Sequence, residues 1–147
     1  ISGAMLGAFV LSMLRRRDGE QLTEYYAKAM MTPVMKWFGR QSGKQKFTPK
    51  DLRGMEETAR LKAADRNPYS WNMDCYPYPD GSGYEARFTA CGICTLMKKL
   101  GLYDLTPALC RLDYTMSEAG GASRFVRQHT LASGGSYCDC GYQKLHS

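Results

Sequence analysis

The sequence contains no hydrophobic run long enough to cross a membrane. The apolar segment 4–14 is too short to span a bilayer, and the basic residues 15–17 follow it, whereas they would precede it in a secretory signal. The chain also lacks internal repeats, low-complexity segments, a phosphate-binding loop and a dinucleotide-binding glycine motif. These absences argue against a membrane-spanning protein, a repeat protein and a Rossmann-type nucleotide-binding enzyme.

No long block of one charge is present either. The chain has 20 Lys and Arg against 14 Asp and Glu, and the resulting net charge of +6 is scattered along its length. This excess suits an anionic small molecule, but no nucleic-acid-binding motif accompanies it, so we expect no nucleic-acid partner and no membrane partner. A composition of 44% hydrophobic and 23% charged residues is that of a globular protein. We expect a single domain over residues 1–147, with a helical part over 1–66 and an α+β part over 67–147.

Cysteine is present, but below the density of a disulfide-stabilised secreted scaffold. All six cysteines lie in the second half of the chain: Cys75, Cys91, Cys94, Cys110, Cys138 and Cys140. Thiols usually stay free in a reducing cytoplasm, so we expect a cytoplasmic protein with free cysteines. Thiolates are nucleophiles and metal ligands, which makes these residues the first candidates for chemistry.

Apolar residues recur at helical spacing throughout the first part of the chain. This pattern predicts helices over 5–14, 22–38 with a kink at Pro33, and 48–63, with residues 39–46 as a polar connection. In the second part, the patterns predict strands over 71–75, 84–90, 124–131 and 137–142, and short helices over 92–100 and 107–119. The order indicates an α+β fold with N-terminal helices packed on an antiparallel sheet that is interleaved with two short helices.

Cys91 stands where a predicted strand ends and a predicted helix begins. The helix dipole and the free N–H groups at such a position favour a thiolate, so Cys91 is a candidate nucleophile. One competing interpretation is a small, buried, apolar residue. Another is structural zinc held by Cys91, Cys94, Cys138 and Cys140, although the second pair departs from the usual ligand spacing. Apart from this zinc alternative, we expect no cofactor.

Two further groups of residues offer chemistry. Cys110 and Asp113 are three residues apart and share one face of a predicted helix. A two-residue loop between the last two strands would place His129 opposite Cys138 and Arg127 opposite Cys140. Such a face would supply a nucleophile, a base and a carboxylate anchor. The alternatives are an Asp113 that pairs with a neighbouring arginine or backbone N–H, and an exposed or core-edge His129.

Three segments of the second half carry a recurring pattern. They are residues 88–91, with a cysteine after a strand, residues 105–113, with Cys-x-x-Asp on a helix, and residues 127–139, with Thr-Leu-Ala-x-Gly before Cys-Asp. In order and spacing this pattern resembles the L-2-amino-thiazoline-4-carboxylic acid hydrolase family. The resemblance implies hydrolytic opening of a thiazoline ring, which is a cyclic amidine, to a carbamoyl-cysteine on the way to cysteine.

The implied reaction needs a nucleophile or directed water, a proton-transfer group and a carboxylate anchor. We expect Cys138 or Cys91 as the nucleophile and Asp113 or Asp139 as the base or orienting group. The expected substrate-binding residues are Arg127, Thr130, His129 and Cys110, of which Arg127 suits a small-molecule carboxylate. The competing hypothesis is a non-catalytic module that holds a small ligand or zinc. The apolar face of the first helix packs internally or against a second subunit, which would make a homo-oligomer.

Overall fold

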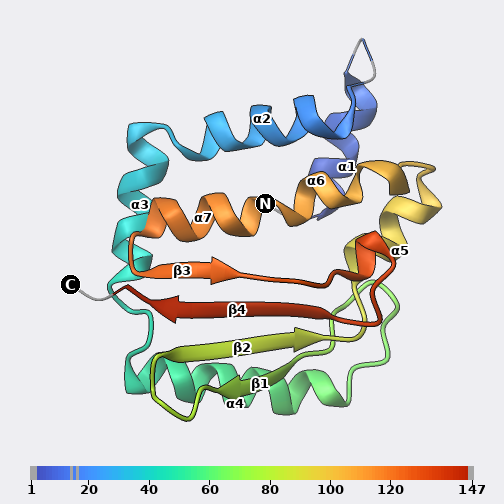
Figure 1. The fold of residues 1–147 in the computed structure, drawn as a ribbon. Helices are drawn as coiled ribbons and strands as arrows, with labels where there is room; N and C mark the ends of the chain where they lie inside the picture. Colours follow the sequence, from blue (N-terminus) through green and yellow to red (C-terminus); the bar gives the residue numbers. More distant parts are fainter. Residues whose placement is uncertain (1–2, 14, 16, 146–147) are drawn as a thin grey trace.

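The computed structural model describes residues 3–13, 15 and 17–145 (Figure 1). Leu14 of the predicted first helix and Arg16 of the basic run lie outside the described residues. The helices are α1 (Gly3–Ser12), α2 (Gly19–Met30), α3 (Pro33–Gly43), α4 (Pro49–Ala63), α5 (Gly92–Lys99), α6 (Thr106–Cys110) and α7 (Leu112–Gly120). The strands are β1 (Asp74–Pro77), β2 (Gly83–Phe88), β3 (Ser123–Val126) and β4 (Cys138–Lys144), and short 3-10 turns occupy η1 (Tyr103–Leu105) and η2 (Leu131–Ser133).

Local capping explains where the first helices begin. Asp18 accepts a hydrogen bond of 2.8 Å from the backbone N–H of Gln21 at the start of α2, and Thr48 accepts one of 3.2 Å from Asp51 at the start of α4. Pro33 is the first residue of α3, so the predicted kink is a break between two helices. The predicted polar connection was too long, because α3 continues to Gly43.

The four strands form one antiparallel sheet in the order β1-β2-β4-β3. Successive side chains in a strand point to opposite faces, so Cys138, Cys140 and Tyr142 of β4 share one face and Asp139 points to the other. Helix α4 packs on β1, and α7 packs along β3, while α2 and α3 contact α6 and α7 (Figure 1). The α+β prediction is confirmed, with α4 as the N-terminal helix that covers the sheet.

The register predicted for the last two strands is correct, because Phe125 pairs with Tyr142 and Val126 with Gly141. β3 is shorter than predicted, however, β4 extends to Lys144, and the two-residue loop is wrong. β3 ends at Val126, and the connection to β4 contains η2, which Thr130 caps by accepting a 3.0 Å hydrogen bond from Ser133. The chain leaves η2 through Gly134 at φ 86°, a conformation that glycine adopts without strain.

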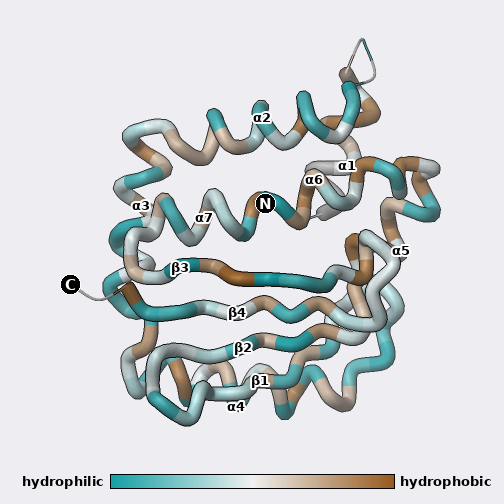
Figure 2. The backbone as a smooth tube through the Cα atoms, in the orientation of Figure 1, coloured by the Kyte–Doolittle hydropathy of each residue, from teal (hydrophilic) through white to brown (hydrophobic). Residues whose placement is uncertain are grey.

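Two hydrophobic clusters hold the elements together. One joins α1, α2, α5, η1 and α6 around Leu22, Met97 and Leu105. The other lies between α4 and the sheet and includes Met73, Ala86, Phe125, Cys138 and Cys140. Figure 2 shows hydrophobic and hydrophilic residues mixed along every element. Within the described part of the chain, no helix combines the length and apolar character needed to cross a membrane.

Candidate functional site

A cavity of about 390 Å³ lies on the Cys138, Cys140 and Tyr142 face of the sheet. Its walls are α4 on one side and α6 with α7 on the other, and residues around the β2–α5 junction close one end. It has the size of a small-molecule site. Six residues that the sequence singled out line this cavity: Cys91, Cys110, Asp113, Arg127, Cys138 and Cys140.

Cys91 is the residue before α5 and lines the cavity beside Trp71, with which it forms an isolated β-bridge. The junction is tight, since a Cβ at Gly92 would lie 2.1 Å from the carbonyl oxygen of Tyr69. The pKa of Cys91 lies below that of an ordinary thiol, chiefly because of the Cys94 thiol and also because of the N–H groups of Cys94 and Ile93 and the indole of Trp71. These groups outweigh burial, which acts in the opposite direction. Cys91 is therefore the cavity thiol prepared to react as a thiolate.

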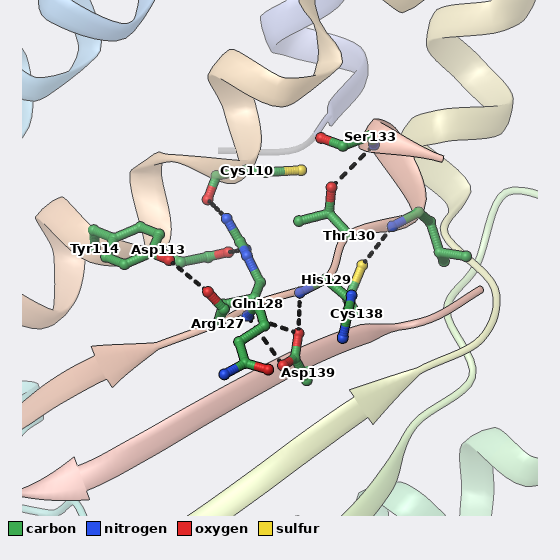
Figure 3. Close-up of polar contacts among 11 residues, drawn as sticks. Cys110, Asp113, Tyr114, Arg127, Gln128, His129, Thr130, Ser133, Cys138 and Asp139 are labelled. Atoms are coloured by element: carbon green, nitrogen blue, oxygen red, sulfur yellow. Dashed lines mark hydrogen bonds and ion pairs between the residues drawn. The ribbon is translucent and has the colours of Figure 1, made fainter. Parts of the chain in front are cut away.

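The other cavity thiols have environments that keep them protonated. Burial raises the pKa of Cys110 and of Cys140 to about 12 in each case. Burial also raises the pKa of Cys138, although its sulfur lies 3.2 Å from the backbone nitrogen of Leu131, whose N–H acts in the opposite direction (Figure 3). Electrostatics therefore favours Cys91 over Cys138 as the nucleophile.

Asp113 and Arg127 form an ion pair of 2.8 Å at the wall of the cavity (Figure 3). The second guanidinium nitrogen of Arg127 donates to the carbonyl oxygen of Cys110, also at 2.8 Å, and the guanidinium lies over the rings of Tyr114 and Phe125. Arg127 is thereby confined, with 6% of its side chain exposed, whereas Asp113 keeps 38%. Burial raises the pKa of Asp113 more than Arg127 lowers it. The accessible member of the pair is a carboxyl group that holds a proton more readily than an ordinary aspartate, which makes it a candidate for proton transfer.

Asp139 is absent from the cavity lining, because its neighbours Cys138 and Cys140 occupy the cavity face of β4. Its carboxylate instead accepts hydrogen bonds from the backbone N–H groups of Gln128, at 3.0 and 3.1 Å, and of His129, at 2.6 Å (Figure 3). These bonds hold the chain that leaves β3, directly after Arg127. Both carboxylate oxygens of Asp139 are therefore engaged with the backbone, outside the cavity lining.

His129 and Thr130 also lie away from this cavity. His129 is exposed and its ring packs edge-on against Tyr137, with centroids 5.3 Å apart, because β3 ends before the register could bring it opposite Cys138. The hydroxyl of Thr130 caps η2, and the residue lines a neighbouring pocket of about 670 Å³. Arg127 and Cys110 border both spaces.

Lys62 is a cavity residue that sequence reasoning missed. It projects from α4, opposite the Asp113 wall, and its ammonium contacts Asp65 at 2.9 Å and Ser70 at 2.7 Å. A lysine ammonium has three N–H donors, so these two partners within the described residues leave one for a ligand. Its side chain is 35% exposed. No local pattern could have identified it, since its role depends on α4 crossing the sheet.

The described residues contain no cluster of three or more His, Cys, Asp and Glu side chains that could hold a metal ion. Among these residues, Cys91, Cys94, Cys138 and Cys140 are not gathered into such a cluster, and the zinc alternative from the sequence stays a prediction. All six cysteines are free thiols in the structure.

Comparison with known proteins bears directly on the resemblance. No curated protein and no solved structure matches the chain. A family model described as L-2-amino-thiazoline-4-carboxylic acid hydrolase matches residues 1–142. The match includes the N-terminal helices as well as the three segments that carry the motif. The chain belongs to the L-2-amino-thiazoline-4-carboxylic acid hydrolase family.

Proposed function

We propose that this protein hydrolyses a cyclic amidine of the 2-amino-thiazoline-4-carboxylate type and opens its ring to a carbamoyl-cysteine. The observation that carries the proposal is the cavity that joins an activated thiol, Cys91, to an accessible carboxyl group, Asp113. The two residues come from chain segments more than twenty positions apart. A small ring held between them meets both a nucleophile and a proton donor.

The first half of the reaction is addition to the ring. The Cys91 thiolate attacks the carbon between the ring nitrogen and sulfur, while protonated Asp113 gives its proton to the ring nitrogen. The adduct then collapses with cleavage of one ring bond, and the substrate stays attached to Cys91 through a carbon–sulfur bond. The raised pKa of Asp113 serves this step, because a carboxyl group must be protonated to act as an acid.

The second half releases the product. The Asp113 carboxylate takes a proton from a water molecule, whose oxygen attacks the same carbon. The bond from carbon to Cys91 breaks and its electron pair returns to the thiolate, while the hydroxyl proton passes to the ring sulfur or nitrogen released in the first half as the carbamoyl C=O forms. One water is consumed overall, and Asp113 ends protonated as it began.

Lys62 is the carboxylate anchor in this proposal. The sequence suggested Arg127, but its side chain is only 6% exposed and is held by Asp113 and the carbonyl of Cys110. Lys62 lies on the opposite wall with a donor to spare. The role of Arg127 is then to hold Asp113 in place. When Lys62 binds the substrate carboxylate, the amidine end of the substrate points toward the thiols and Asp113.

The test is incubation of the purified, reduced protein with racemic 2-amino-thiazoline-4-carboxylate, followed by mass spectrometry for carbamoyl-cysteine. We expect product from one enantiomer. A free thiol in the product would show cleavage on the sulfur side, and a free amine would show cleavage on the nitrogen side. Binding without turnover would favour the ligand-binding module. No product from folded protein, with and without added divalent metal, would overturn the proposal.

We also propose a cellular location and an oligomeric state for the protein. We place the protein in a reducing cytoplasm, supported by its six free thiols. A homo-oligomer is supported by exposed apolar residues of α1, such as Leu11 at 55% exposure, beside the buried Val10. Light scattering at several protein concentrations checks the oligomer, and a monomer throughout would contradict it.

A further inference from the structure

Cys91 and Cys94 lie together at the first turn of α5. Residues three apart at a helix start lie side by side, at a separation of Cα atoms that suits a disulfide. The two thiols interact directly, since each is the largest influence on the ionisation of the other. The hydrolysis proposed above uses Cys91 alone, so the presence of Cys94 in contact with it requires its own explanation.

The two sulfurs differ in access. Cys91 lines the cavity, and Cys94 is buried behind it with 9% of its surface exposed. The nearby N–H groups of α5 and the Trp71 indole favour the thiolate at Cys91, while contact with Cys91 and burial keep Cys94 protonated. One thiol is thus placed to meet a solute, and the other is placed to meet only the first.

We propose that Cys91 and Cys94 form a reversible oxidation site, in which peroxide attacks Cys91 and Cys94 resolves the product as a disulfide. The Cys91 thiolate takes an oxygen from hydrogen peroxide, breaking its O–O bond and leaving a sulfenic acid and hydroxide. The Cys94 thiol then displaces the sulfenic hydroxyl, so that an S–S bond forms and water departs with the Cys94 proton. A dithiol reductant reverses the oxidation by becoming a disulfide itself.

The other cavity thiols are less suited to resolve Cys91. Cys110 lies on α6, and Cys138 and Cys140 lie on β4, so none of them shares the first turn of α5 with Cys91. Cys138 is also held by the N–H of Leu131. The CxxC pair is independent of the substrate, and only its effect on turnover rests on the proposed function.

The direct test treats the native, full-length protein with graded hydrogen peroxide, blocks free thiols, and maps disulfides by mass spectrometry of peptides. We expect one intramolecular disulfide between Cys91 and Cys94, removed by dithiothreitol, in both wild type and the Cys75→Ser control. Cys75 lies on β1, outside the cavity lining. A disulfide from Cys91 to Cys110 or Cys138 would overturn the proposal. So would the absence of any disulfide across peroxide amounts from below one equivalent to a modest excess.

A second test removes the resolving thiol. In Cys94→Ser, we expect peroxide to carry Cys91 to sulfinic and sulfonic acids that dithiothreitol cannot reverse, whereas wild type recovers fully. Recovery in the variant would contradict the assignment of Cys94. If the variant does not fold, Trp37→Phe leaves Trp71 as the only tryptophan, and its emission should change on oxidation and return on reduction. If the hydrolase proposal fails, the mapped disulfide still decides this one.

Discussion

The two faces of the sheet are built from the same strands but differ in chemistry. On one face, Cys138 and Cys140 form the floor of a cavity closed by three helices. On the other, Asp139 pairs in register with Arg87, whose guanidinium bonds Glu85 and lies over the rings of Tyr76 and Tyr137. Asp139, Arg87 and Glu85 on this second face already have protein partners. The covered face therefore keeps reactive groups available to a ligand, whereas charged groups on the open face are held in ion pairs and hydrogen bonds within the protein.

Loss of the cavity nucleophile should have the largest effect. We expect Cys91→Ser to lower kcat/KM for the thiazoline substrate by about a thousand-fold or more, because a serine hydroxyl is not ionised at neutral pH. The matched control is Cys75→Ser, which removes a thiol outside the cavity and should retain wild-type turnover. Equal activity of Cys91→Ser and wild type would reassign the nucleophile, with Cys138 next in line.

The two carboxylates of the two faces allow a direct comparison. We expect Asp113→Asn to lower kcat by about 10²–10⁴-fold, since an amide cannot transfer the proton. Asp139→Asn should lower kcat by only a few-fold and the free energy of unfolding by about 1–2 kcal/mol, because its charge holds two backbone N–H groups. Kinetics and urea denaturation on both variants measure these effects. A larger loss of kcat in Asp139→Asn than in Asp113→Asn would reverse the assignment of the faces.

Much of the sheet was predictable, because its pattern is local. Alternation located the strands, and the register that pairs Phe125 with Tyr142 followed from the sequence. The end of β3 was not predictable, since it depends on Asp139 binding the N–H groups of residues 128 and 129. The predicted 107–119 helix likewise breaks at Arg111, where α6 packs against α5, η1 and η2 and α7 packs against α3 and β3.

The site was predictable where local rules applied. Position at a helix start identified Cys91, and helical spacing joined Cys110 to Asp113. Asp139 was grouped with Cys138 because the motif makes them adjacent, although strand alternation directs adjacent residues to opposite faces. The sequence could not predict Lys62 as a cavity residue, because only the tertiary packing of α4 brings it there.

Removing one cation from each face should have a moderate effect. We expect Lys62→Met to raise KM about ten-fold with kcat largely kept, as one charge-assisted bond to the substrate carboxylate is lost. Arg87→Met should leave KM unchanged and change stability little, as its ion pair with Glu85 is partly exposed. Steady-state kinetics on both variants checks this, and an unchanged KM in Lys62→Met would return the anchoring role to Arg127.

The smallest effect concerns the pH dependence of the thiols. The pKa of Cys91 is lowered, chiefly by the Cys94 thiol, so its alkylation by iodoacetamide should stay fast as the pH falls below the ordinary thiol range. The pKa of Cys75 is raised by burial, so its alkylation should need alkaline pH. Because folding favours the Cys91 thiolate, its contribution to the free energy of unfolding is present above the unfolded pKa and is lost as the pH falls through the folded pKa.

In Cys94→Ala, the rising part of the curve of Cys91 alkylation rate against pH should move to higher pH, while that of Cys75 stays in place. Alkylation rates measured peptide by peptide give the pH dependence at both cysteines. A Cys91 curve that this substitution does not move would show that the helix N–H groups alone activate Cys91.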